Sequence, residues 1–197
     1  MEQSQNHSGV QMRPFSFAVL AGGRSSRMGC DKAGLFWNGK TFLQHQIDKA
    51  SALGCTEIMV SGGVHRQPGT LYVADIFPHR GPLGGIYSCL ARASEHCCLF
   101  LSVDVPQVSA NTLQQLLNLY WASDADAAIL HTAHGDEPLI GVYRTSVQKS
   151  IRPLLETGSP GVYRLLSKIH VATLDAPSSE VIINCNTPQD LMRLYQS

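Results

Sequence analysis

An apolar run near the start of the chain ends in two adjacent glycines, and this junction constrains the fold more than any other feature. Residues 15–20, Phe-Ser-Phe-Ala-Val-Leu, have the pattern of a short strand buried on both faces. Gly22 and Gly23 follow, and because they have no Cβ, their backbone N–H groups are open to a close partner. Three cations come next: Arg24, Arg27 and Lys32. Open donors and clustered charge favour a polyanion such as a nucleoside triphosphate, and the alternative is an ordinary glycine turn flanked by solvated cations.

The spacing of these residues excludes two familiar phosphate-binding loops. A P-loop needs glycine, four residues and then Gly-Lys-Ser/Thr, and neither Gly22 nor Gly23 is followed by Gly-Lys at that interval. The pattern Gly-x-Gly-x-x-Gly is also absent, so a dinucleotide fingerprint is not supported.

Composition limits the class of partner. The 197 residues carry 15 Lys plus Arg and 15 Asp plus Glu, so the formal net charge is zero. A chain of this length fits one domain with a proper core. Because no global basic field attracts nucleic acid, any polyanion site must be local.

The chain termini and cysteines point to a soluble cytoplasmic protein. Residues 1–13 are polar, lack the apolar segment of a signal peptide and are expected to form a disordered tail ahead of a domain covering residues 14–197. No apolar stretch approaches the roughly 18 residues needed to cross a membrane. The six cysteines show no C-x-x-C spacing and are expected to be reduced thiols without structural zinc.

Strand-like and helix-like segments alternate along the chain. Apolar runs predict strands at residues 57–61, 71–73, 97–103, 127–130, 139–143 and 181–183. A short hairpin or turn is expected at residues 35–39, and helices are expected at about 41–53, 81–93, 113–120, 146–155, 161–168 and after Pro188. Residues 131–137 fit no ordered zinc motif and are expected to form a mobile loop. The alternation implies βαβ units, and we expect a single Rossmann-like α/β domain of three layers with a mostly parallel central sheet.

Polar residues follow several of these expected strands. Open parallel sheets bind ligands beyond the carboxyl ends of their strands. The residues expected at that edge are Ser61, Asp75, Asp104, Asn184 and Asn186. Asp104, which follows the most apolar run, either forms an Asx turn before Pro106 or holds a cation. A triphosphate at the same edge favours Mg²⁺, which takes one or two carboxylates together with phosphate oxygens and water.

The segment Leu20-Ala-Gly-Gly-x-Ser-x-Arg-Met-Gly-x-Asp-Lys32 closely resembles the signature of nucleotidyltransferases that activate sugar phosphates and cofactors. It is nearest the MobA-type molybdenum cofactor guanylyltransferases. Further matching blocks are Gly81–Gly85, Ser102–Pro106, Glu137–Tyr143 and Asn184–Pro188. The resemblance implies transfer of GMP from GTP to the phosphate of molybdopterin, with Mg²⁺ as cofactor and pyrophosphate as the released product. It also implies transient contact with proteins that deliver molybdopterin or mature molybdoenzymes.

The resemblance implies site residues at the matching positions. The catalytic residues it implies are Arg27, Lys32 and Asp104. The nucleotide-binding residues are Leu20, Ala21, Gly22, Gly23, Lys32, Ser61, Asp75, Gly84 and Asp104. The metal ligands are Asp104 and Asn186, and the acceptor-side candidates are Asn184, Asn186 and Glu137. Ser61 replaces an Asn found in many relatives and so lacks the amide donor.

Two other readings stay open. A related transferase could use CTP, or act on a sugar or polyol phosphate; relatives specific for CTP usually read Leu-Ala-Ala-Gly, so the Gly22-Gly23 pair of this chain favours GTP. A non-catalytic nucleotide-binding protein would not need Lys32, Asp104 and the two asparagines together.

Overall fold

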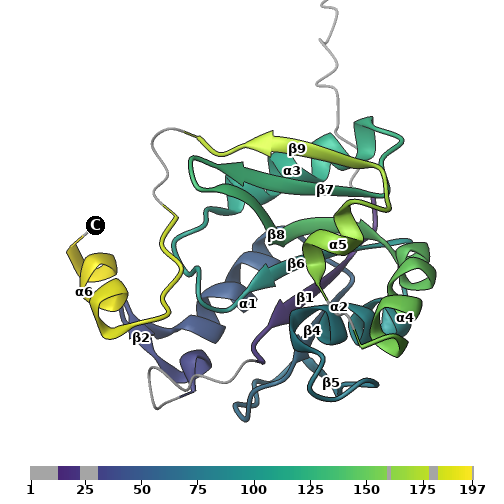
Figure 1. Cartoon of the computed structure of the whole chain (residues 1–197). Helices are drawn as coiled ribbons and strands as arrows, with labels where there is room; N and C mark the ends of the chain where they lie inside the picture. The colour runs from purple at the N-terminus through teal and green to yellow at the C-terminus, as the bar shows by residue number, and fades with distance from the viewer. Residues whose placement is uncertain (1–12, 23–30, 159–160, 178–181, 197) are drawn as a thin grey trace, which may run out of the picture.

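The computed structural model describes residues 13–22, 31–158, 161–177 and 182–196, and a seven-stranded sheet lies at its centre (Figure 1). The sheet order is β5-β4-β1-β6-β8-β7-β9. Its strands are β1 (Ser16–Leu20), β4 (Glu57–Ser61), β5 (Leu71–Val73), β6 (Cys97–Ser102), β7 (Ala127–Thr132), β8 (Gly135–Arg144) and β9 (Val171–Asp175). The α-helices are α1 (Phe42–Ala52), α2 (Gly81–Arg92), α3 (Ala110–Ala122), α4 (Gln148–Glu156), α5 (Val162–Leu166) and α6 (Pro188–Gln196). The 3₁₀ turns are η1 (Lys32–Gly34) and η2 (Thr145–Val147), and a small ladder pairs β2 (Phe36–Trp37) with β3 (Lys40–Thr41).

The sheet is covered on both faces. Alternate residues of β1 point to opposite sides: Phe17 and Val19 pack in the core beneath α1 and α3, whereas Ala18 and Leu20 pack beneath α2, α4 and α5. This two-sided burial explains why β1 and β6 are continuous apolar runs. The predicted three-layer α/β fold is confirmed.

The predicted elements of the first half of the chain are confirmed. β4 and β5 have the predicted bounds. Thr41 caps α1 by accepting a hydrogen bond from the Gln44 N–H at 3.1 Å. The turn before α1 is the β2–β3 hairpin, whose tip is formed by Asn38 and Gly39, both with positive φ.

The second half of the sheet is less regular. Within the described sheet, β8 is the one strand that runs antiparallel to its neighbours, β6 and β7. The expected mobile loop at residues 131–137 is wrong, because β7 and β8 continue through it as a hairpin. His131 pairs with Asp136 both in the ladder and through its side chain, with Nδ1 2.7 Å from Oδ1.

The last sheet strand lies at a different position from the one predicted. β9 pairs in parallel with β7, yet its sequence Val-Ala-Thr-Leu-Asp is short and only partly buried, so it carries little strand signal. The predicted strand at residues 181–183 is wrong for Ile182 and Ile183, and Val181 lies outside the described residues. The Ile183 carbonyl accepts a hydrogen bond from the Gln107 side chain at 2.9 Å instead of a strand partner.

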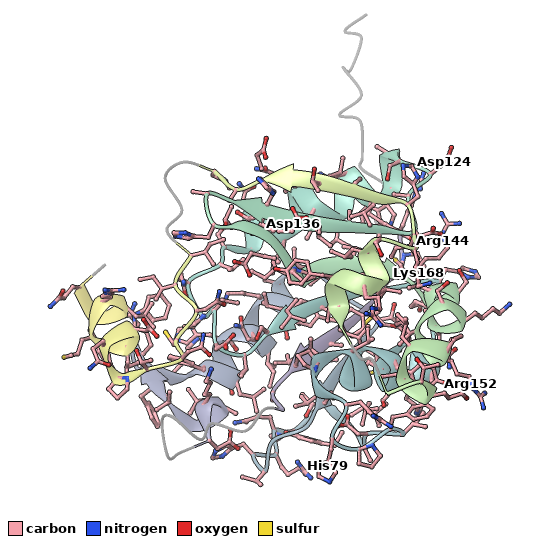
Figure 2. All side chains as sticks on the ribbon, viewed as in Figure 1. His79, Asp124, Asp136, Arg144, Arg152 and Lys168 are labelled. Atoms are coloured by element: carbon pink, nitrogen blue, oxygen red, sulfur yellow. The ribbon has the colours of Figure 1, made fainter. Side chains whose placement is uncertain are left out.

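The amino edge of the sheet is closed by polar contacts. Arg144, at the end of β8, donates to the Ala125 carbonyl at 3.1 Å, and Asp124 lies beside it (Figure 2). The predicted tail lies outside the described residues except for Arg13, whose guanidinium donates to the Trp121 carbonyl at 3.3 Å. Within the described ranges, every helix is too short or too polar to traverse a bilayer.

Candidate active site

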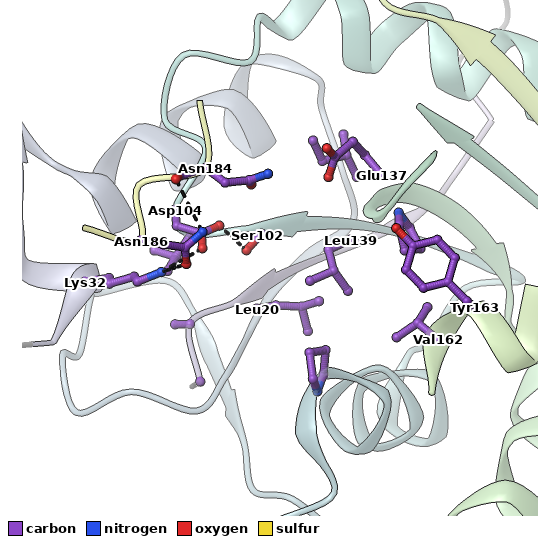
Figure 3. A pocket seen from close by; sticks show the side chains of 16 residues that line it. Leu20, Lys32, Ser102, Asp104, Glu137, Leu139, Val162, Tyr163, Asn184 and Asn186 are labelled. Atoms are coloured by element: carbon purple, nitrogen blue, oxygen red, sulfur yellow. Dashed lines mark hydrogen bonds and ion pairs between the residues drawn. The ribbon is translucent and has the colours of Figure 1, made fainter. Parts of the chain in front are cut away.

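Two adjoining cavities, of about 540 and 570 Å³, lie at the carboxyl ends of β1, β4 and β6. We name the first the Glu137 lobe; its polar lining comes from Lys32, Asp104, Glu137, Tyr163, Asn184 and Asn186 (Figure 3). We name the second the Asp75 lobe; its lining includes Ser61, Asp75, His79, Gly81 and Gly85. The residues shared by both lobes are Leu20, Gly22, Pro82, Ser102 and Leu139. The two lobes therefore form one continuous site with two ends.

A lysine, a carboxylate and an amide meet at one side of the Glu137 lobe. Lys32 Nζ donates to Asp104 Oδ2 at 2.9 Å and to Asn186 Oδ1 at 2.6 Å (Figure 3). Ser102 Oγ donates to the other Asp104 oxygen at 2.6 Å. The side chains of Lys32 and Asp104 are 16% and 17% exposed, so these charges are shielded from bulk water but open to a ligand in the cavity.

The oxygens around the Lys32 ammonium suit a hard divalent cation. The ammonium already places a positive charge between a carboxylate oxygen of Asp104 and the amide oxygen of Asn186, which are ligand types that Mg²⁺ accepts. In the described part of the chain, no group of three or more His, Cys, Asp or Glu side chains could hold a metal. A cation here would therefore need further oxygens from phosphate and water, which is how Mg²⁺ is usually bound.

The segment that carries Asn186 is fixed by the start of α6. Asp190 Oδ2 accepts hydrogen bonds from the backbone N–H groups of Asn186 and Thr187, at 3.1 and 2.9 Å. The Asp190 N–H in turn donates to Thr187 Oγ1 at 3.2 Å, which completes a reciprocal capping box. The Cys185 N–H donates to the Asp104 carbonyl at 3.0 Å and ties this segment to the end of β6.

Glycines allow close backbone packing around the Asp75 lobe. A Cβ on Gly62 would collide with the backbone of Gly22, so the turn after β4 can approach the end of β1 only because residue 62 has no side chain. A Cβ on Gly85 would lie 2.8 Å from Ser61 Oγ, so α2 begins directly against the end of β4. Ser61 Oγ donates a long hydrogen bond to Asp75 Oδ1 at 3.4 Å, and this orients the carboxylate in the lobe.

Glu137 sits in the first residues of β8, half-buried beside Asn184. Burial raises the pKa of the Glu137 carboxyl, the negative charge of Asp104 acts in the same direction, and a hydrogen bond with the Asn184 side chain opposes them. The lobe thus holds two carboxyl groups whose charges repel each other, and a cation or an N–H donor between them would relieve that repulsion.

The structure brings most of the predicted site residues together. Those lining the two lobes are Leu20, Ala21, Gly22, Lys32, Ser61, Asp75, Asp104, Glu137, Asn184 and Asn186. Gly23 and Arg27 lie outside the described residues. Gly84 does not line either lobe; it is buried, and a Cβ there would lie 3.0 Å from the Phe77 carbonyl.

Three lining residues with polar side chains are not among the predicted site residues: Ser102, Tyr163 and His79. Ser102 could have been found as the polar residue that ends the apolar run of β6. Tyr163 gives no such signal, because it lies at the second position of a five-residue helix and reaches the site only through the tertiary fold. His79 precedes the glycine-rich start of α2 and has a positive φ of 62°, which the sequence does not reveal.

Comparisons with known proteins agree with this architecture. Residues 17–173 match the model of the MobA-like NTP transferase domain. A Xanthomonas euvesicatoria protein named molybdenum cofactor guanylyltransferase is 35% identical, over 92% of this chain and 95% of its own length. A Nostoc protein named probable molybdenum cofactor guanylyltransferase is 32% identical, over 91% of this chain and 90% of its own.

Solved structures show the same fold. The Archaeoglobus fulgidus molybdopterin-guanine dinucleotide biosynthesis protein A superposes with a TM-score of 0.79 at 22% identity, over 92% of this chain and 97% of its own. A Mycobacterium tuberculosis protein in complex with manganese superposes with a TM-score of 0.73 at 22% identity, over 93% and 98% of the two chains. The family match spans most of the described sheet and the lining of both lobes apart from Asn184 and Asn186, and the chain belongs to the MobA-like NTP transferase family.

Proposed function

We propose that this nucleotidyltransferase transfers GMP from GTP to the phosphate of molybdopterin, forms the guanine dinucleotide cofactor and releases pyrophosphate. The observation that carries the proposal is the contact of Lys32 with both Asp104 and Asn186 inside one continuous two-lobed site. A transferase needs a charged centre between two substrate compartments, whereas a simple nucleotide-binding protein needs only one compartment. The names of the relatives in Xanthomonas and Nostoc support the choice of substrates.

The Asp75 lobe is the proposed nucleoside compartment. Its Asp75 carboxylate can accept hydrogen bonds from the N1–H and exocyclic amine of guanine, two adjacent donors that cytosine does not present. Because the Ser61 side chain is small and Gly85 has none, a ribose in this lobe can approach the start of α2. Because Ser61 stands where many relatives have Asn, any further contact with the nucleoside is left to the serine hydroxyl or to the backbone.

The triphosphate is proposed to lie where the lobes meet. Gly22 offers an unhindered backbone at the end of β1, and Lys32 supplies a point charge to the phosphate oxygens. Gly23, through its backbone, and Arg27 are proposed to add further donors. Both residues lie outside the described ranges. These contacts would hold the α-phosphorus in line with the acceptor.

The metal is proposed to be Mg²⁺, held by Asp104 and Asn186. When bound, it would neutralise phosphate oxygens and stabilise the negative charge that grows on the leaving pyrophosphate. Ser102 fixes the Asp104 carboxylate through its 2.6 Å hydrogen bond, so this ligand is oriented before the substrate arrives.

The acceptor is proposed to enter the Glu137 lobe, next to Asn184 and Asn186. Its phosphate is already ionised at neutral pH, so an acceptor oxygen can attack the α-phosphorus of GTP without a protein base. One new P–O bond forms, the bond to the bridging oxygen between the α- and β-phosphates breaks, and pyrophosphate leaves with the electron pair. The work of the protein is positioning and charge stabilisation.

Pyrophosphate release with purified protein, Mg²⁺ and molybdopterin tests this proposal. We expect release with GTP and little with CTP at the same concentration. Release with CTP alone, or with a sugar phosphate in place of molybdopterin, would assign the chain to a related transferase. GTP binding without pyrophosphate release under any acceptor condition would make it a non-catalytic nucleotide-binding protein.

A further inference from the structure

Tyr163 is highly exposed but is held in a fixed position. The residue is 64% exposed, yet its hydroxyl donates to the Asp136 carbonyl of the β7–β8 hairpin at 2.8 Å. Two residues later, Leu165 is fully buried and anchors α5 in the core. The ring is therefore fixed at its backbone and at its hydroxyl, and it loses little side-chain freedom when a ligand binds.

The ring of Tyr163 borders the Glu137 lobe. Val162 and Leu139 lie on the same side of the cavity and form an apolar wall, and Glu137 supplies a carboxylate to the same lobe (Figure 3). Pro138 adds to the apolar lining. Among the described residues that line this lobe, Tyr163 contributes the one aromatic ring. An aromatic platform next to an apolar wall, with a carboxylate close by, suits a flat heterocycle that carries N–H donors on one edge.

We propose that Tyr163 recognises the acceptor by stacking on its fused heterocyclic ring, while Glu137 accepts hydrogen bonds from the N–H edge of that ring. This inference rests on the proposed function, since it assigns the pterin of molybdopterin to a specific surface of the Glu137 lobe. It also narrows the substrate class, because a polyol phosphate has no flat π-face to stack on Tyr163. Stacking on an aromatic side chain tolerates small changes in the ring but requires a planar partner.

A second tyrosine provides a matched control. Tyr195 of α6 is 58% exposed and its hydroxyl donates to the Phe36 carbonyl at 2.6 Å, so its exposure and its anchoring contact are comparable to those of Tyr163. Tyr195 is not among the described residues that line the two lobes. Replacing Tyr195 should therefore leave pterin binding unchanged.

The test measures binding of 6-hydroxymethylpterin phosphate by quenching of its fluorescence, together with the KM for molybdopterin and for GTP in pyrophosphate release. We expect Tyr163→Ala to weaken probe binding and raise the KM for molybdopterin about tenfold, which is the range for loss of one stacked ring. The KM for GTP should not change. Tyr163→Phe keeps the ring and should bind the probe within a few-fold of wild type, and Tyr195→Ala should match wild type.

Two results would overturn the inference. Wild-type affinity for the probe in a folded Tyr163→Ala variant would show that the ring contributes nothing, and equal losses in Tyr163→Phe and Tyr163→Ala would assign the effect to the hydroxyl contact. The wild-type protein tests the proposed function separately: if it turns over molybdopterin while Tyr163→Ala keeps its KM, the inference about Tyr163 fails alone. If the wild-type protein releases no pyrophosphate with molybdopterin, the proposed function fails whatever the variants do.

Discussion

The two lobes of the site are built from different kinds of structure. The Asp75 lobe lies at the ends of the parallel strands β1 and β4, where Gly22, Gly62 and Gly85 allow backbone segments to touch. The Glu137 lobe is assembled from an antiparallel hairpin, a five-residue helix and the segment before α6. Backbone packing therefore shapes the first lobe, and a few side-chain contacts shape the second.

The largest expected effect comes from Asp104, which lines the Glu137 lobe and accepts a hydrogen bond from Ser102, a residue that lines both lobes. Asp104→Asn keeps the size of the side chain but removes the charge that pairs with Lys32 and would hold the metal. We expect the rate of pyrophosphate release to fall on the order of a thousandfold, with the melting temperature nearly unchanged.

Asp124→Asn provides the control for this change, because Asp124 is exposed at the opposite edge of the sheet (Figure 2). A folded Asp104→Asn protein with the wild-type rate would remove Asp104 from the reaction. It would also leave the two lobes without a common chemical centre.

A smaller loss is expected when the orientation of Asp104 is disturbed but its charge is kept. Ser102→Ala removes the 2.6 Å hydrogen bond to Asp104 Oδ1. Partners of this kind typically contribute ten- to hundredfold to metal affinity or activity, so we expect about tenfold more Mg²⁺ to be needed for half-maximal rate. Titration of the rate with Mg²⁺ at saturating GTP measures this shift. An unchanged Mg²⁺ dependence would mean that Ser102 does not position the ligand.

Replacing the carboxylate at either end of the site, Asp75 or Glu137, should change the KM for a different substrate in each case. Asp75→Asn should raise the KM for GTP about tenfold and leave the KM for molybdopterin unchanged, because it removes the acceptor of charged hydrogen bonds in one lobe. Glu137→Gln should do the reverse. Steady-state kinetics with each substrate varied in turn measures both. If both variants raise the same KM, the assignment of one substrate to each lobe is wrong.

The sequence predicts elements with strong local signals correctly and misplaces elements that depend on tertiary contacts. β1, β4 and α1 carry local signals, such as a continuous apolar run or the Thr41 cap, and these elements were predicted correctly. β9 and the segment at Ile183 were misassigned, because strand pairing depends on neighbours rather than on the apolar content of a few residues.

Site residues follow the same rule. Lys32, Asp104 and Asn186 belong to recognisable motifs, and the structure brings them within hydrogen-bonding distance. Tyr163 reaches the Glu137 lobe through contact with a hairpin 27 residues away in the sequence, so no local pattern marks it. The motif residues of the Glu137 lobe were thus readable from sequence, whereas Tyr163 in the same lobe required the fold.

The smallest effect should come from Glu57, which lies at the amino edge of the sheet, away from both lobes. Its Oε1 accepts hydrogen bonds from Ser16 Oγ at 2.7 Å, the Ser94 N–H at 2.7 Å and Ser94 Oγ at 2.9 Å. Burial acts to raise the pKa of Glu57, but these hydrogen bonds and the charge of Arg92 outweigh it and hold the pKa below its ordinary value of 4.5. A carboxyl with a lowered folded-state pKa stabilises the fold above its unfolded pKa, and this contribution is lost as the pH falls through the folded pKa.

Glu57→Gln should therefore lower the free energy of unfolding by about 1 kcal/mol at pH 7, and the difference from wild type should close as the pH falls below 4.5. Urea unfolding at pH 7 and at progressively lower pH measures the gap. Neither KM should change at pH 7, because the contacts of Glu57 join the starts of β1 and β4 to the segment before β6 and do not reach the site. A changed KM for GTP alone would mean that the parallel half of the sheet transmits strain to the Asp75 lobe. That result would break the contrast between the Asp75 lobe, which is shaped by backbone packing, and the Glu137 lobe, which is shaped by side-chain contacts.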